Sequence, residues 1–139
     1  MGLDHSFEVF VNAFANNVNV KIEDLNFDVM GDLTYRVNVC ADRLEHSTLN
    51  LDFLPEDSTI PSFSFHATRI TLVSFDQDGK YCDITVGGVG EVDGVSYSFN
   101  ATFRDHDYPS KISSVEDFII TDLFDQSRAV VFNEISIKD

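Results

Sequence analysis

The stretch YCDITVGGVGEVDGVSYSFNATFR, residues 81–104, decides the fold class. Apolar and polar residues alternate on both sides of Asp93-Gly94. Asp-Gly favours the two-residue type I′ turn, because both central positions of that turn need a positive φ. Alternation of period two is typical of strands with one buried face. The segment therefore predicts a β-hairpin, and the glycines at 87, 88 and 90 predict a bulge or bend in its first strand.

The same alternation predicts strands elsewhere in the chain. They are expected at residues 18–22, 25–29, 33–39, 49–54, 63–74 and 129–137. The break Met30-Gly31-Asp32 predicts the turn before a return strand, and Pro55 ends another strand because proline cannot donate to a ladder. Residues 63–104 are expected to form a three-stranded antiparallel meander.

Two segments have helical rather than strand spacing. Phe7, Phe10, Val11 and Phe14 stand at i, i+3, i+4 and i+7, which predicts a short N-terminal helix. The run 113–116, Ser-Ser-Val-Glu, matches a capping box and predicts a second helix through Leu123. The expected fold is therefore α+β, with about seven strands in a mostly antiparallel sheet and one or two helices packed on it.

Composition narrows the function classes. The chain has 139 residues, enough for one domain, and its 24 acidic and 9 basic residues give a net charge of −15. Nucleic-acid binding needs clustered basic residues, and an anionic membrane would repel this surface. No apolar run approaches the roughly 20 residues of a membrane span, and no signal-peptide pattern opens the chain, so the expected location is the cytoplasm of a cell or of an infected host.

Motifs for catalysis or metal binding are weak. The triplets His46-Ser47-Thr48 and His66-Ala67-Thr68 resemble the H-x-T motifs of two-histidine phosphoesterases, but a strongly acidic chain is a poor host for an anionic substrate. Asp76-x-Asp78-Gly79 resembles the opening of a calcium loop, yet Gly87 stands where the bidentate Glu belongs. The two cysteines, Cys40 and Cys82, are expected to be reduced. The sequence thus predicts no enzyme, cofactor or metal.

The acidic residues gather in two blocks. The first covers residues 23–32 and the second residues 105–125, where Lys111 is the single base. Such surfaces attract basic partners and orient them. The residues expected to bind a partner are Glu23, Asp24, Asp28, Asp32, Asp105, Asp107, Glu116, Asp117, Asp122 and Asp125.

Three functions follow as hypotheses. The first is a small acidic inhibitor that covers the basic surface of a nuclease or other nucleic-acid-binding protein; in charge and size the chain resembles immunity proteins and phage-encoded DNA mimics. The second is a structural or assembly module of a virion or appendage, with the acids serving solubility. The third is a small hydrolase or ligand-binding domain.

Overall fold

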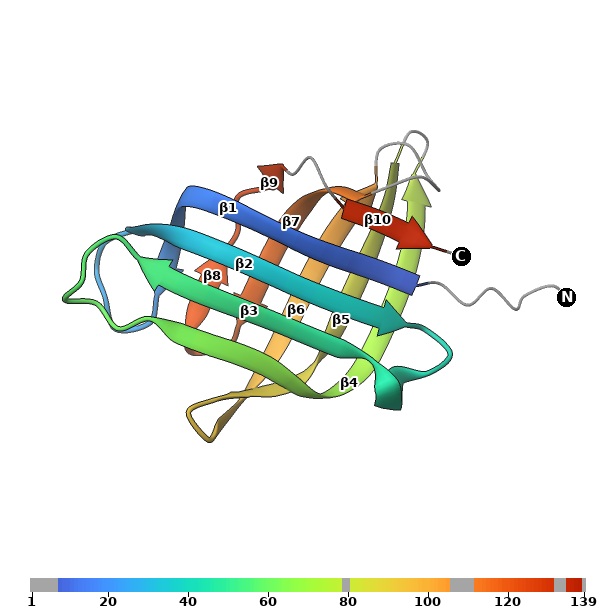
Figure 1. The fold of residues 1–139 in the computed structure, drawn as a ribbon, viewed down its shortest axis with the longest axis horizontal. Coiled ribbons are helices and arrows are strands. Elements are labelled where there is room, and N and C mark those ends of the chain that lie inside the picture. Colours follow the sequence, from blue (N-terminus) through green and yellow to red (C-terminus); the bar gives the residue numbers. More distant parts are fainter. Residues whose placement is uncertain (1–7, 79–80, 106–111, 132–134, 139) are drawn as a thin grey trace, which may run out of the picture.

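The computed structural model describes residues 8–78, 81–105, 112–131 and 135–138, and it is almost entirely β-structure (Figure 1). Its elements, in chain order, are β1 (Glu8–Ile22), β2 (Val29–Cys40), the 3-10 turn η1 (Leu44–His46), β3 (Thr48–Pro55), β4 (Phe63–Asp78), β5 (Tyr81–Val92), β6 (Val95–Asp105), β7 (Ile112–Ile120), β8 (Phe124–Gln126), β9 (Val130–Val131) and β10 (Ile135–Lys138).

The strands close into a barrel. Neighbours along the chain pair antiparallel from β1 to β8, and β8 pairs in turn with the end of β1, Lys21 opposite Asp125 and Ile22 opposite Phe124. The short strands β9 and β10 pair with β7 and with the start of β1 respectively. In Figure 1 the run β1–β4 passes in front of β5–β8 at a steep angle, as expected for tilted barrel strands.

The expected α+β class is therefore wrong, and the N-terminal helix is the first reason. Residues 8–22 form β1, with Val9, Val11 and Ala13 buried inside the barrel. Phe10 and Phe14, which suggested a helical stripe, lie outside with 40% and 58% of their surface exposed. The inward alternation, with β-branched Val9 and Val11, determines the conformation of this segment, because it fits a pleated surface with one buried face.

The second expected helix is also a strand. Val115, Phe118 and Ile120 of β7 are buried, and the pairing with β6 shifts by one residue beside Glu116. This bulge converts a period-two series into the 115–118 spacing that suggested a helix. Instead of capping a helix, Ser114 donates a hydrogen bond from Oγ to the Glu116 carboxylate at 2.5 Å. Among the described residues the helical content is limited to η1.

The predicted meander is confirmed, but the bulge predicted in its middle strand is not. β4, β5 and β6 pair in succession, and the turn at Asp93 and Gly94 has φ of 51° and 81°. The bulges at the glycine cluster lie on β4, opposite Gly88 and Gly90, rather than in β5. Outside the meander, the turn predicted at Met30-Gly31-Asp32 and the strand predicted at residues 25–29 are wrong, because the first turn spans residues 23–28 and Gly31 lies within β2.

Aromatic side chains fill the barrel. Phe65, Phe99 and Phe118 pack with ring centroids 5.4–6.3 Å apart. Near one end Phe53, Phe63 and Phe124 form a second group at 5.5–5.7 Å. Between strands, Tyr35 donates its hydroxyl to Gln126 Oε1 at 2.6 Å, and burial raises the pKa of this phenol. Eight strands leave an interior just wide enough to be filled in this way.

Candidate functional site

The acidic residues concentrate at one end of the barrel. Because the strands run up and down in order, the loops 23–28, 56–62, 93–94 and 121–123 all lie at the same end. We call these four loops the acidic end. They contain seven acidic residues and no lysine or arginine: Glu23, Asp24, Asp28, Glu56, Asp57, Asp93 and Asp122. The loop 41–47, at the opposite end, has two acids and one arginine.

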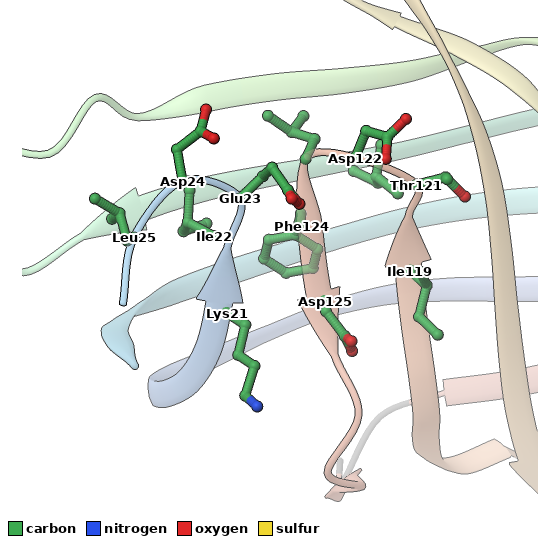
Figure 2. A pocket seen from close by; sticks show the side chains of 12 residues that line it. Lys21, Ile22, Glu23, Asp24, Leu25, Ile119, Thr121, Asp122, Phe124 and Asp125 are labelled. Carbon is green, nitrogen blue, oxygen red and sulfur yellow. The ribbon is translucent and has the colours of Figure 1, made fainter. Parts of the chain in front are cut away.

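Barrel closure brings the two acidic blocks into contact. The Glu23 amide donates to the Leu123 carbonyl at 2.9 Å, which joins the β1–β2 loop to the β7–β8 turn. A pocket of about 380 Å³ lies between them, and we call it the turn pocket. Figure 2 shows Glu23 and Asp24 on one of its sides and Asp122 on the other, with Lys21 and Asp125 on the neighbouring strands.

The backbone conformation of the two turns favours aspartate at two of these positions. Asp24 has a φ of 75° and Asp122 a φ of 69°, both in the left-handed region. Aspartate is one of the few residues other than glycine that enter this region readily, because its short side chain bonds locally. The turn itself therefore explains part of the aspartate usage, and asparagine would preserve the same backbone.

A further aspartate organises the β3–β4 loop. The Asp57 carboxylate accepts hydrogen bonds from the Thr59 amide at 2.9 Å and the Thr59 hydroxyl at 2.7 Å. Both bonds favour the ionised form and hold the pKa of Asp57 below its ordinary value. The loop is thus ordered by a carboxylate that keeps its charge.

A separate charged group lies on the outer wall of β5–β8. Arg104 binds Asp83 with Nε at 2.7 Å from Oδ1, and its Nη1 lies 3.1 Å from Glu116 Oε1. Asp117 lies beside this group. The pKa of Asp117 is raised, chiefly by burial. The negative charges of Glu116, Asp125 and Asp83 raise it further, whereas a hydrogen bond from Thr102 lowers it.

Asp125 has a special position between this wall and the turn pocket. It is only partly exposed, and its Oδ1 atom is buried without a hydrogen-bond donor among the described residues. A buried acceptor without a donor is costly unless a partner supplies one. Because this atom is buried, the carboxylates that a cationic group can reach at the turn pocket are the exposed ones of Glu23, Asp24 and Asp122.

The predicted partner-binding residues divide into groups. Glu23, Asp24, Asp122 and Asp125 line the turn pocket, and Asp28 belongs to the same loop as the first two. Asp32 lies instead on β2, where it accepts a hydrogen bond from the Asn17 amide at the β1 bulge. Glu116 and Asp117 belong to the outer wall described above.

Of the remaining two predicted residues, the structure describes only the first. Asp105 ends β6, which places its backbone at the opposite end of the barrel. Asp107 lies outside the described residues. The described residues of the second acidic block are therefore divided among the acidic end, the opposite end of the barrel and the outer wall of β5–β8.

Sequence reasoning missed three acids of the acidic end, namely Glu56, Asp57 and Asp93. They stand singly or in pairs between strands, so no local charge run marks them. Their shared position follows from up-and-down topology, in which alternate loops meet at one end. That topology is the signal that could have found them.

The weak motifs gain no chemistry from the structure. His46 ends η1 and His66 lies on β4, both exposed, and the Thr68 hydroxyl donates to the Val89 carbonyl at 3.2 Å. Within the described ranges, no three His, Cys, Asp or Glu side chains gather as metal ligands. Cys40 and Cys82 are not joined in a disulfide. No helix in the described part of the chain has the length and hydropathy to cross a membrane.

The chain matches no protein-family model, no curated protein and no solved structure, so a functional assignment rests on the geometry of the acidic end.

Proposed function

We propose that this protein is a small acidic binding protein that docks its acidic end on a basic surface of another protein and blocks that surface. The observation that carries the proposal is the gathering of seven acids and no base on four loops of one barrel end. Clustered charge of one sign accelerates encounter with a partner of opposite charge and selects its orientation.

The chemistry of the partner follows from the charge. Dense arrays of Lys and Arg on protein surfaces are typical of proteins that bind nucleic-acid phosphates. A nuclease or another nucleic-acid-binding protein in the same cytoplasm is therefore the expected target. The protein would then act as an immunity protein or a phage-encoded DNA mimic acts, by occupying the site that phosphates would occupy.

The turn pocket brings carboxylates of both acidic blocks together. Glu23, Asp24 and Asp122 line it with exposed side chains, and Asp125 and Lys21 line it from the neighbouring strands. An arginine or lysine from the partner would donate hydrogen bonds to the exposed carboxylates. Charge-assisted hydrogen bonds of this kind are stronger than those between neutral groups.

The test compares two variants of equal net charge. The first carries Glu23→Gln, Asp24→Asn, Asp122→Asn and Asp125→Asn, which retain the turn conformations. The control carries Asp42→Asn, Glu45→Gln, Asp52→Asn and Asp76→Asn, which lie outside the acidic end. The partner is isolated from the native cell or host at 50 mM salt, and the affinity of each variant for it is measured.

We expect the first variant to bind ten- to a hundredfold more weakly than the original protein, and the control to change by less than about threefold. Binding should also weaken steeply between about 50 and 500 mM salt. Equal losses in both variants, salt-insensitive binding or a partner without a basic surface would refute the proposal.

An assembly module is a second candidate, favoured by one observation. Apolar side chains are exposed on the outer face of β1–β3, with Phe14 at 58%, Met30 at 40% and Leu54 at 62%. Exposed apolar groups of this size mark association surfaces when they are contiguous. Concentration-dependent oligomers that Phe14→Ser with Leu54→Ser abolishes would favour this candidate over the first.

A further inference from the structure

A second pocket, of about 450 Å³, opens at the acidic end beside the turn pocket. We call it the mouth pocket. It lies between the β1–β2 loop, the β3–β4 loop and the β5–β6 hairpin, which share one end of the barrel in Figure 1. Most of its lining is apolar, including Ile22, Leu25, Ile60, Phe63, Val95 and Tyr97.

These apolar side chains are only partly covered by the protein itself. Val92 is buried, but Val95 is 53% exposed, and Ile60 and Leu25 are half-buried. Apolar surface left open in a concave site gains free energy when an apolar ligand covers it. A volume near 450 Å³ falls within the range of small-molecule sites.

The pocket is formed before any ligand arrives. Its floor continues into the core, because Phe63 packs against Phe53 and Phe124 at 5.6 and 5.5 Å. Its walls are held by turn hydrogen bonds, from the Leu25 amide to the Ile22 carbonyl at 3.1 Å and from the Ile60 amide to the Asp57 carbonyl at 3.0 Å. Binding therefore requires little reorganisation of the chain.

The charges around the pocket specify the polar part of a ligand. Glu23 and Asp93 line it from the β1–β2 loop and the β5–β6 turn, and both are exposed. No lysine or arginine is among its described lining residues. An anionic group would meet two carboxylates there, whereas a cationic group would be attracted by both.

We propose that the mouth pocket binds a small organic cation, with its apolar body against the Ile60 and Phe63 wall and its ammonium group beside Glu23 and Asp93. Glu23 lines both this pocket and the turn pocket, but the ligand of the mouth pocket differs from the proposed protein partner because it is recognised by apolar contact as well as charge. Occupation of the pocket would place a bound cation within the acidic end.

The test uses 4-phenylbutylamine as the probe and 4-phenylbutanoate as its anionic counterpart. Two-dimensional NMR at 50 mM salt follows the amides of the mouth pocket during titration. We expect saturable binding of the amine with a Kd on the order of 1 mM, as suits about eleven heavy atoms, and at least tenfold weaker binding of the carboxylate.

Three variants separate the causes. Glu23→Gln with Asp93→Asn removes the two carboxylates and keeps the turn, since asparagine also adopts a positive φ; we expect about fivefold weaker binding. Asp42→Asn with Glu45→Gln makes the same change of net charge at the far end and should leave the Kd within twofold. Val95→Trp, at an exposed position, fills the pocket and should abolish saturation.

Several results would overturn the inference. They are no saturable binding of the amine, equal affinity for the carboxylate, equal losses in the two double variants, or unchanged binding to the Val95→Trp variant. Glu23→Gln is common to both tests, but Asp24→Asn, Asp122→Asn and Asp125→Asn are used only with the protein ligand, so failure of amine binding leaves the proposed protein partner to its own test.

Discussion

A single carboxyl group, that of Asp117, links the acidic surface to stability. Its pKa is raised, chiefly by burial and secondarily by the neighbouring acids. A carboxyl whose pKa is higher in the folded than in the unfolded state favours folding at low pH, and this contribution is lost as the pH rises through the folded pKa. Ionised Asp117 therefore destabilises the barrel at pH 7.

We expect Asp117→Asn to raise the melting temperature at pH 7 by a few degrees at most, since the group is partly solvated. The increase should shrink as the pH is lowered toward the range in which Asp117 is protonated. Thermal unfolding followed by circular dichroism between pH 3.5 and 7 measures both. Asp76→Asn, at an exposed site, is the matched control. A gain that is equal at every pH would contradict this reading of Asp117.

Also at the residue scale, Gln126 connects strands inside the barrel. Its Oε1 accepts from Tyr35, while Nε2 donates to the Arg128 carbonyl at 2.6 Å and to the Val115 carbonyl at 3.3 Å. Tyr35→Phe leaves Oε1 without that donor in a buried place. We expect a loss of about 1–3 kcal/mol in urea unfolding. Tyr97→Phe, at a half-buried site, should cost less than about 0.5 kcal/mol.

At the scale of elements, the backbones of β4 and β5 come so close together at Gly88 that no side chain fits between them. A Cβ at Gly88 would lie 2.1 Å from the Arg69 carbonyl oxygen, which is backbone and cannot move aside. A Cβ at Gly87 would meet its nearest neighbours at 3.3–3.6 Å. We expect Gly88→Ala to cost about 2 kcal/mol or more and Gly87→Ala less than about 1 kcal/mol, measured by urea unfolding. Equal losses of stability in the two variants would show that the bulges of β4 can shift to make room for a side chain at Gly88.

The elements also show which parts of the fold the sequence could predict. Residues 81–104 were predictable because alternation and the Asp93-Gly94 turn agree with each other. β1 was not, because its outward Phe10 and Phe14 combine with inward Val11 to mimic a helical stripe. In β7, the bulge at Glu116 separates the buried residues Val115 and Phe118 by three positions, which also resembles helical spacing. Strand bulges and outward aromatics are tertiary features, so period alone cannot identify them.

At the scale of the whole molecule, closure of the barrel determines the charge pattern. The pairing of β1 with β8 places Glu23 and Asp24 beside Asp122, nearly 100 residues later in the chain. The sequence showed two acidic blocks but not that only part of the second would join the first. Local charge runs reveal density, whereas the order and direction of strands determine which runs share an end. The acidic end is thus a property of topology.

Seven like charges on four adjoining loops must repel one another, and this repulsion opposes folding at low salt. We expect the variant with Glu23→Gln, Asp24→Asn, Asp122→Asn and Asp125→Asn to be more stable than the original protein by about 1 kcal/mol at 10 mM salt. The control with Asp42→Asn, Glu45→Gln, Asp52→Asn and Asp76→Asn should gain less.

Urea unfolding at 10 mM and 500 mM NaCl measures the gain in the free energy of unfolding of each variant. The gain of the first variant over the control should fall by more than half at the higher salt, because screening shortens the range of repulsion to a few ångströms. A gain in stability together with a loss of partner binding would mean that the acidic end is retained against a cost in folding. No gain over the control would mean that the loops hold their carboxylates far enough apart for water to screen them, and that the charge has no cost for the barrel.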